Sequence, residues 1–586
     1  MCGVFGFVGT EQSVPRSVGV ALKSLEYRGY DSWGMVWREG DSLRTVKQTG
    51  KVPGTFAFEA VSRIAVGHTR WATHGGVTED NAHPHFDSDG RVAIVHNGII
   101  ENATSLRTLL PAAVRFKSQT DSEVVAHLLG LEVRRGHSIG EALRRVFPLL
   151  EGQNAIVAID QQSEVIVAAM NVSPLVIGMG DQGTCIASDP FALAGRATTM
   201  IVAPREAVIE LTEDEIRAIS FDGISIPLPD PFPVPDVSAD ELGPHSTFMA
   251  KEMSEQPHVL RWLSTNNTGV EELSALIEQS DTVLFTGCGS AFFASRLGAA
   301  WLGRLASRPA LAVQASEMAD HRSFLGPRTL VCAVTQSGET ADVLEAMTMG
   351  RSAGATVAAI TNVEHSSAAR FADLVVPLGA GRERSVLATK SMTAMLGRML
   401  STAFCVGGKS ESSISALQTA AHGIEELSTS DDFQNFLGAA TDAISRSQHA
   451  YVIGRGDGFA VAQEAALKIK ESSYIHAEAF AAGELKHGAI ALIEPGSPCL
   501  LFTTDHLQAR DTASSAQEVR SRGGYTIGVG PGFEEVADIR LEVPLDGPPL
   551  AIVEVYVAQS LALSLALERN LDPDYPRNLA KSVTVK

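Results

Sequence analysis

Cysteine is scarce in this chain of 586 residues, and its six copies lie far apart in the sequence. They form no Cys-x-x-Cys pair and no other spacing typical of a metal site. This scatter is typical of a protein from a reducing compartment, where disulfides are rare. We therefore expect neither a disulfide framework nor a cysteine-bound metal.

Positive charge is also scarce, because 47 Lys and Arg face 68 Asp and Glu, for a formal net charge of −21. Such an excess argues against binding nucleic acid or an anionic membrane surface. The amino terminus lacks a charged leader followed by an apolar run, and no uncharged apolar stretch is long enough to cross a bilayer. We expect a cytoplasmic protein in which any phosphorylated ligand is held by backbone dipoles and a few side chains.

The length corresponds to roughly four domain-sized units. In the first third, short β-branched runs separated by turns outnumber the two helical segments at 17–26 and 121–134. Such a pattern predicts stacked sheets, not an alternating α/β unit. The expected strands cover residues 63–67, 91–95, 154–159 and 164–169.

Cys2 directly follows the initiator methionine and becomes the terminal residue once that methionine is removed. Its thiolate is then a nucleophile, and its own α-amine, with a pKa near 8, is an adjacent base. The alternative is a buried cysteine in an apolar first strand, since a free cysteine usually behaves as a small hydrophobe.

Polar residues follow the expected strands of the first third. Asn97 and the Gly98 amide could stabilise an oxyanion, Arg70 could bind a substrate carboxylate, and Asp121 could bind a substrate ammonium group. Each has a plain alternative: Asn97-Gly98 is a typical hairpin turn, Asp121 a typical helix N-cap and Arg70 a surface ion pair.

The segments at residues 2–3, 25–32, 68–75, 81–84 and 96–102 resemble the class II glutamine amidotransferase domain, an N-terminal-nucleophile αββα fold. This resemblance implies that Cys2 attacks the glutamine side-chain amide, forms a γ-glutamyl thioester and releases ammonia. It implies that Trp71 helps to close the ammonia route. The residues implied to hold glutamine are Arg70, Thr73, His74, Gly98 and Asp121. A metal cluster of His74, His83, His85 and His96 is disfavoured, because the family uses none and Pro84 separates the closest pair.

A proline-dense segment at 226–236 predicts an extended, semi-rigid domain boundary. Beyond it, apolar strands alternate with helices, and a strand–glycine–helix pattern occurs at 284–290 and again at 451–457. We therefore predict two α/β units with parallel sheets, related by tandem duplication. The expected strands cover residues 282–286, 310–313, 329–335, 356–360, 450–453, 499–502 and 526–529.

Two glycine- and hydroxyl-rich loops in the first of these units predict an anion pocket, at 287–290 and at 335–340. The second unit carries acid–base candidates: Lys468 and Glu471 on a helix expected to begin near residue 461, and His487 in a loop. Plain alternatives stay open, since Glu471 could be an exposed carboxylate and His487 a cap. The tail beyond residue 573 could be a solvated end.

The segments at 334–342, 465–471, 476–479, 483–488 and 576–585 are similar to the family of isomerising glutamine–fructose-6-phosphate aminotransferases, the glucosamine-6-phosphate synthases. The resemblance covers the whole chain. It implies two sugar isomerase (SIS) domains and an imine between Lys581 and the open-chain ketose. It implies that Glu471 moves a proton between C1 and C2 beside Lys468, and that His487 of a neighbouring subunit helps to open the sugar ring. A homodimer without metal or organic cofactor is expected, with ammonia channelled between the two sites.

The predicted fold is thus an α+β N-terminal-nucleophile (αββα) glutaminase domain followed by two α/β parallel-sheet SIS domains. The predicted boundaries are 1–228 for the glutaminase, 229–245 for the linker, 246–425 and 426–570 for the SIS domains, and 571–586 for the tail. The predicted sugar-phosphate site comprises Cys288, Gly289, Ser290, Thr335, Gln336, Ser337, Thr340, Val386 and Ala580.

Three residues depart from the family pattern. Ala291 and Ala388 stand where members usually carry serine, and Leu387 stands where they carry alanine. Each lost hydroxyl donor could cost on the order of 1–3 kcal/mol of binding. The predicted activity is the glutamine-dependent conversion of fructose 6-phosphate to glucosamine 6-phosphate. A relative acting on another ketose phosphate, or a non-catalytic SIS-type sensor of sugar phosphates, remains the alternative.

Overall fold

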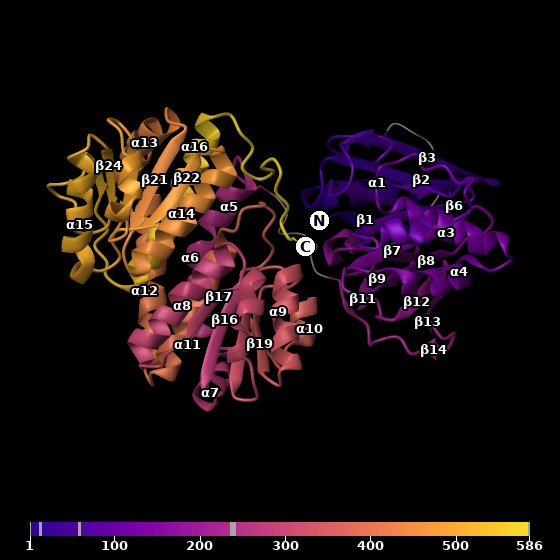
Figure 1. The fold of residues 1–586 in the computed structure, drawn as a ribbon, viewed down its shortest axis with the longest axis horizontal. Coiled ribbons are helices and arrows are strands. Elements are labelled where there is room, and N and C mark those ends of the chain that lie inside the picture. Colours follow the sequence, from indigo (N-terminus) through magenta and orange to yellow (C-terminus); the bar gives the residue numbers. More distant parts are fainter. Residues whose placement is uncertain (1, 11–13, 57–59, 235–241, 584–586) are drawn as a thin grey trace. The chain divides into compact units, whose positions relative to one another are not determined.

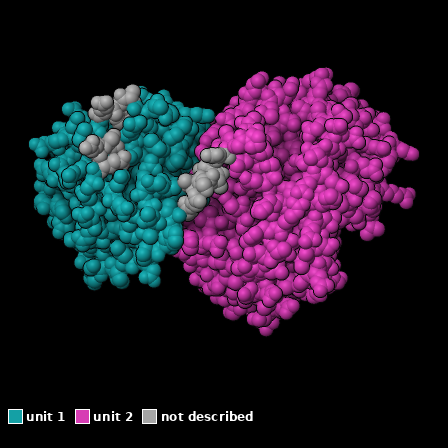
Figure 2. All heavy atoms as spheres, turned by 180° about the vertical axis from the view of Figure 1, so that it is seen from behind, with its two compact units in different colours: residues 1–241, 580–586 teal, residues 242–579 magenta. Residues whose placement is uncertain are grey.

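The computed structural model describes residues 2–10, 14–56, 60–234 and 242–583. The chain forms two compact units, residues 1–241 with 580–586 and residues 242–579 (Figure 2). We describe each unit by itself.

The first unit contains two antiparallel sheets (Figure 1). The eight-stranded sheet has the order β15-β11-β9-β10-β1-β4-β2-β3, and the seven-stranded sheet has the order β14-β13-β12-β8-β7-β6-β5. The strands are β1 (Gly3–Gly9), β2 (Ser32–Glu39), β3 (Ser42–Thr49), β4 (Ile64–Arg70), β5 (His85–Phe86), β6 (Val92–Gly98), β7 (Asn154–Asp160), β8 (Ile166–Met170), β9 (Val176–Gly180), β10 (Gly183–Ala187), β11 (Thr199–Val202), β12 (Ala207–Leu211), β13 (Ile216–Ser220), β14 (Ser225–Ile226) and β15 (Phe232–Pro233). The helices are α1 (Val14–Leu25), α2 (Ala103–Arg107), α3 (Glu123–Arg134) and α4 (Ile139–Val146).

The side chains of each strand point alternately into two different layers of this unit. On β1, Val4 and Val8 belong to the core that contains apolar residues of both sheets, whereas Phe5 and Phe7 pack with α1 on the other face. On β6, Ile94 packs with α3 and α4. Successive side chains of a strand point to opposite faces, so one sequence fills two cores. The unit is therefore an αββα sandwich, as predicted.

The second unit contains two five-stranded parallel sheets with matching orders, β17-β16-β18-β19-β20 and β22-β21-β23-β24-β25. In both, the first strand along the chain lies between the second and the third, so the carboxyl ends of these central strands form a topological switch point. The strands are β16 (Thr282–Gly287), β17 (Leu311–Gln314), β18 (Thr329–Thr335), β19 (Thr356–Thr361), β20 (Leu374–Pro377), β21 (His449–Gly454), β22 (His476–Ala481), β23 (Pro498–Phe502), β24 (Tyr525–Val529) and β25 (Ile539–Leu541).

Helices of both halves contribute to one continuous apolar core. The contributing helices are α5 (Phe248–Ser254), α6 (Gln256–Thr265), α7 (Val270–Gln279), α8 (Ser290–Ala306), α11 (Lys390–Val406), α12 (Ser410–Ser428), α13 (Asp431–Ser445), α14 (Asp457–Ser473) and α16 (Pro548–Glu568). Outside this core lie α9 (Ala341–Ser352), α10 (Ser367–Phe371) and α15 (His506–Arg520). The helix that carries Lys468 thus begins at Asp457, four residues before the expected start.

Helix α16 is long and apolar enough to cross a membrane by length and composition alone. However, 83% of its apolar window is buried inside the protein, and Glu554 interrupts the uncharged run. Its apolar side chains pack in the core of the second unit, which is the ordinary role of such a helix in an α/β fold.

Two residues of the proline-dense segment, Phe232 and Pro233, form the edge strand β15, which pairs with β11 of the first unit. Proline is tolerated there because an edge strand has one side without ladder bonds. Residues 235–241 of the predicted linker lie outside the described residues.

Candidate active site

Cys2 lies just before β1, and its Sγ accepts a hydrogen bond from the Trp71 amide at 3.3 Å. Asn97 at the end of β6 donates from Nδ2 to the Cys2 carbonyl at 3.0 Å. Burial raises the pKa of the Cys2 thiol, whereas the Trp71 amide and the Arg70 charge favour the thiolate. Cys2 is half-buried and lines a cavity, so the alternative of a strand-core cysteine is wrong.

The cavity gathers most of the side chains predicted for the glutamine site. Gly98 also lines it, at a backbone φ of +136° that favours glycine. The residues that line it are Cys2, Arg70, Trp71, Thr73, His74, His83, His96, Gly98, Thr120, Asp121 and Ser122.

Hydrogen bonds to the turn after β4 hold the side chain of Arg70 in place. Its guanidinium donates to the carbonyls of His74 at 2.5 Å and of Gly76 at 3.1 Å. Gly29 lies directly behind this turn, where a Cβ would come within 2.6 Å of the Arg70 carbonyl carbon and 2.7 Å of the Trp71 nitrogen. The glycine in the 25–32 segment therefore allows two backbones to pack closely beside Cys2.

The plain alternatives for three residues are wrong. Arg70 is 3% exposed and bonds loop carbonyls, so it is not a surface ion pair. Asn97 and Gly98 continue the β6–β7 ladder and form no hairpin turn. The N-cap of α3 is Ser122, and the Asp121 carboxylate instead accepts the Ile100 amide at 2.6 Å.

Four buried histidines form a cluster at the cavity, His68, His83, His85 and His96, and His83 and His96 line it. Burial lowers the pKa of each imidazole, that of His68 to about 3. The His83 ring centroid lies 4.1 Å from that of His68 and 4.5 Å from that of His85. Within residues 2–10, 14–56, 60–234 and 242–583, no group of three or more His, Cys, Asp or Glu side chains is arranged to hold a metal. Neutral, stacked imidazoles fit a packing role here.

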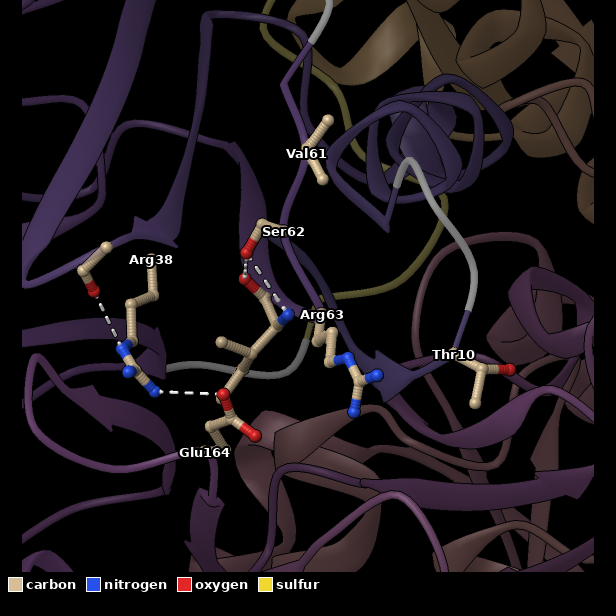
Figure 3. Close-up of a pocket in the computed structure, with 8 residues that line it drawn as sticks. Thr10, Arg38, Val61, Ser62, Arg63 and Glu164 are labelled. Carbon is tan, nitrogen blue, oxygen red and sulfur yellow. Dashed lines mark hydrogen bonds and ion pairs between the residues drawn. The ribbon is translucent and has the colours of Figure 1, made fainter.

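A larger hollow lies elsewhere on the first unit (Figure 3). Its two guanidinium groups already have carboxylate partners, Arg38 with Glu164 at 3.1 Å and Arg63 with Glu213 at 3.5 Å. Cys2 does not line it, so size alone does not identify the reactive site.

In the second unit, the two predicted loops follow the central strands β16 and β18, whose carboxyl ends lie side by side. Ser290 is the first residue of α8, after Gly289 at φ +55°. Within the other loop, the Thr335 hydroxyl accepts the Gly338 amide at 3.1 Å. The loops thus occupy the switch point where ligands bind in such sheets.

Lys468 and Glu471 lie on α14 and form an ion pair at 2.5 Å, with the lysine only 1% exposed. Glu464, one turn earlier and fully buried, lies 3.7 Å from Lys468 and accepts the Ser290 hydroxyl at 3.0 Å. Burial lowers the pKa of Lys468, but Glu471 and Glu464 outweigh it and raise the pKa above its usual value. Burial raises the pKa of Glu464.

Sequence reasoning missed Glu464, although its spacing of four from Lys468 places both on one helix face. The contact also changes the interpretation of Ser290, whose hydroxyl is directed to a carboxylate in this structure.

The remaining predicted residues are dispersed. The Val386 amide donates to the Asp574 carbonyl at 3.2 Å, which anchors the base of the tail. His487 is exposed at the end of a short 3₁₀ turn, Leu485–His487. Lys581 and Ala580 are half-buried and group with the first unit. Leu387 is 1% exposed in the core, so its bulk is directed into packing.

An antiparallel sandwich with a cysteine pocket, followed by twin parallel sheets, defines an amidotransferase joined to sugar isomerase units. The family described as "Glutamine amidotransferase domain" matches residues 68–195, and "SIS domain" matches residues 276–403 and 443–569.

The chain belongs to the glutamine–fructose-6-phosphate aminotransferase (isomerizing) family. It is 36% identical over 625 residues to the protein of that name from Leifsonia xyli subsp. xyli, and 38% identical over 619 residues to that from Symbiobacterium thermophilum, with 100% of each chain covered. The solved C-terminal domain of glucosamine-fructose-6-phosphate aminotransferase from Francisella tularensis matches with a TM-score of 0.51 and 26% identity, over 57% of this chain and 99% of that one.

Proposed function

We propose that this protein converts fructose 6-phosphate and glutamine into glucosamine 6-phosphate and glutamate. The observation that carries the proposal is the cavity that joins Cys2 to a fixed guanidinium and a carboxylate, in a chain that matches a relative of this family over that relative's whole length. A cation and an anion at one pocket suit the two charged ends of a free amino acid.

In the first half-reaction, after removal of Met1, the α-amine of Cys2 takes the thiol proton and Sγ attacks Cδ of glutamine. The Asn97 side chain and the Gly98 amide stabilise the oxyanion, a contribution of about 3–4 kcal/mol for one such donor. The C–N bond breaks, ammonia leaves with the proton, and water hydrolyses the thioester to glutamate. Arg70 holds the substrate carboxylate, Asp121 holds its ammonium group, and Thr73 and His74 complete the pocket.

In the second half-reaction, the Lys581 amine condenses with the C2 carbonyl of the open-chain ketose and water leaves. Ammonia, channelled from the first site behind Trp71, adds to C2 and displaces the lysine. Glu471 takes a proton from C1 and returns it to C2, so that C1 becomes the aldehyde and C2 carries the amine. Lys468 stabilises the charge of Glu471.

The phosphate is held by amides and hydroxyls at the ends of β16 and β18, which suits an acidic protein with little positive charge. The contributing residues are Cys288, Gly289, Ser290, Thr335, Gln336, Ser337 and Thr340, with Val386 and Ala580 beside the sugar. No metal or organic cofactor enters either half-reaction.

We further propose a cytoplasmic homodimer. His487 is exposed, and its imidazole makes no hydrogen bond within the described residues, which leaves it available to open the sugar ring on a neighbouring subunit. Sedimentation of the purified protein tests the dimer, and a monomer that retains full activity would overturn it.

The experiment is to measure glutamate and amino-sugar phosphate formed from glutamine and a panel of ketose phosphates. We expect fructose 6-phosphate to be used, and Cys2→Ala to abolish glutamine use. Glutamine hydrolysis without any turnover of fructose 6-phosphate would overturn the proposed substrate.

A further inference from the structure

The two sheets of the second unit carry helices that correspond residue by residue. Helices α8 and α14 each contain 17 residues, and each follows a glycine with nearly the same backbone angles, φ +55° at Gly289 and φ +57° at Gly456. Each also ends at a left-handed residue that is not glycine, Ser307 and Tyr474. Their first residues, Ser290 and Asp457, are therefore equivalent.

The equivalent positions carry different side chains. Where α14 has Lys468 and Glu471, at its twelfth and fifteenth positions, α8 has Trp301 and Arg304. The first residue of α8 is a hydroxyl that contacts a carboxylate on α14. The first residue of α14 is a carboxylate, and its partners on α8 are an indole N–H and a guanidinium.

Asp457 is 3% exposed, and its Oδ2 accepts a hydrogen bond from Trp301 Nε1 at 2.6 Å. Arg304 forms an ion pair with the same oxygen. Another acid, Glu554, is fully buried near the ends of β23 and β24; burial, and secondarily the charge of Asp457, raise its pKa well above the usual value. The switch point of the second sheet therefore already contains an anion at the N-terminus of α14, where a ligand phosphate would otherwise bind.

We infer that Asp457 is a positioning residue for the sugar-phosphate reaction. Its carboxylate acts as an internal anion that ties the start of α14 to Trp301 and Arg304 of α8. This inference rests on the proposed function, because its consequence concerns Lys468 and Glu471, eleven and fourteen residues further along the same helix.

The tie matters because α8 and α14 form two faces of one site. Ser290 at the start of α8 meets Glu464 on α14, and Asp457 at the start of α14 meets Trp301 and Arg304 on α8. These two contacts, at opposite ends of α8, restrict both sliding and rotation of α14 against it. If one is lost, α14 can shift against α8, and a misplacement of about 1 Å can cost about a hundredfold in rate.

The test uses Asp457→Asn in the full-length protein, which keeps the shape and the indole contact but removes the charge. We expect kcat for glucosamine 6-phosphate to fall at least about tenfold, with the KM for fructose 6-phosphate changed less than about twofold. Glutamine hydrolysis in the first unit should be unchanged. As a matched control, Asp281→Asn breaks an exposed ion pair with Arg328 in the same unit and should leave every parameter unchanged.

Arg304 provides a second route, because its side chain is 41% exposed and its replacement should not prevent folding. Arg304→Met should lower kcat as Asp457→Asn does, and Arg304→Lys should restore most of it. A merely structural role would lower the thermal midpoint of all three variants but leave the kcat of the folded enzyme at its original value.

Unchanged kcat in Arg304→Met, or a loss that Arg304→Lys does not restore, would overturn the inference. So would a change confined to KM. The rate of the unaltered protein with fructose 6-phosphate tests the proposed function, whereas the ratio of variant to unaltered rate, on whichever ketose phosphate is used, tests Asp457. The two failures are therefore distinguishable.

Discussion

Lys468 is a buried cation whose charge we expect to stabilise the second unit. It is 1% exposed and lies between Glu464, which is fully buried, and Glu471. Lys468→Met removes the charge and leaves the Glu464 carboxylate without it. Breaking a buried pair from one side costs about 3–5 kcal/mol. Glu464 can escape part of this cost by taking up a proton, which at pH 7 costs about 3 kcal/mol relative to an unfolded carboxyl of pKa near 4.5. We therefore expect a loss of about 3 kcal/mol.

The stability loss of Lys468→Met should depend on pH, because the pKa of Glu464 differs between the folded and unfolded states. Burial raises the pKa of Glu464 in the folded state, so the variant's penalty is absent below the unfolded pKa and grows as pH rises above it. In calorimetry, a unit of about 340 residues has an unfolding entropy of about 0.7 kcal/mol/K, so 3 kcal/mol lowers Tm by about 4 °C. The deficit should be smaller at pH 5 than at pH 8.

The double variant Glu464→Gln/Lys468→Met serves as the control. Glutamine cannot ionise and can still accept the Ser290 hydroxyl, so most of the lost stability should return, although amino-sugar formation should not. A deficit in the single variant that is independent of pH, or a double variant as unstable as the single one, would refute the reasoning.

Three further predictions concern other parts of the chain. Gly29→Ala should lower kcat for glutamine hydrolysis at least about tenfold, because the new Cβ would lie 2.6 Å from the Arg70 backbone. Gly54→Ala, whose Cβ meets open space, is the control. Equal rates of glutamine hydrolysis in the two variants would contradict the prediction. Burial raises the pKa of Glu123, but hydrogen bonds from His127, Ser118 and backbone amides outweigh it and lower the pKa to about 2. The stability that the Glu123 carboxylate provides above about pH 4.5 is therefore lost as pH falls towards 2. Melting curves should show that the stability deficit of Glu123→Gln shrinks over that window. Ala291→Ser adds a hydroxyl in the first turn of α8 and should lower the KM for fructose 6-phosphate about fivefold; steady-state kinetics that show no decrease would argue against a phosphate at this helix.

Much of the fold follows from sequence patterns with short periods. The expected strand at 329–335 coincides with β18, and the strand expected at 154–159 differs from β7 by one residue. These strands are buried, so their apolar runs are unbroken. The exposed strand β3 has no such run, and its place in the sheet is determined by pairing with β2, which is a tertiary contact and leaves little local signal.

Some residues of the candidate site could likewise be placed from sequence, whereas contacts between distant residues could not. Arg70 and Asn97 could be placed near strand ends from sequence, because they lie three and two residues beyond the expected strands at 63–67 and 91–95. The contact of Ser290 with Glu464 spans 174 residues and depends on how two helices pack, so no local pattern indicates it. The N-cap expectation for Asp121 failed for the same reason, since the Ile100 amide competes for its carboxylate.

The bond between Ser290 and Glu464 has a consequence for catalysis. It lowers the pKa of Glu464, against the larger effect of burial. When a phosphate binds at the start of α8, the Ser290 hydroxyl can turn towards it, and Glu464 then binds its proton more tightly. Lys468 then pairs with Glu471 alone, so the binding of substrate changes the charge next to this proposed proton carrier. We expect the acid limb of kcat, which reports the complex, to lie at lower pH than that of kcat/KM, which reports the free enzyme. Ser290→Ala should abolish this difference while Thr335→Ala should not, and a difference that persists in Ser290→Ala would refute the coupling.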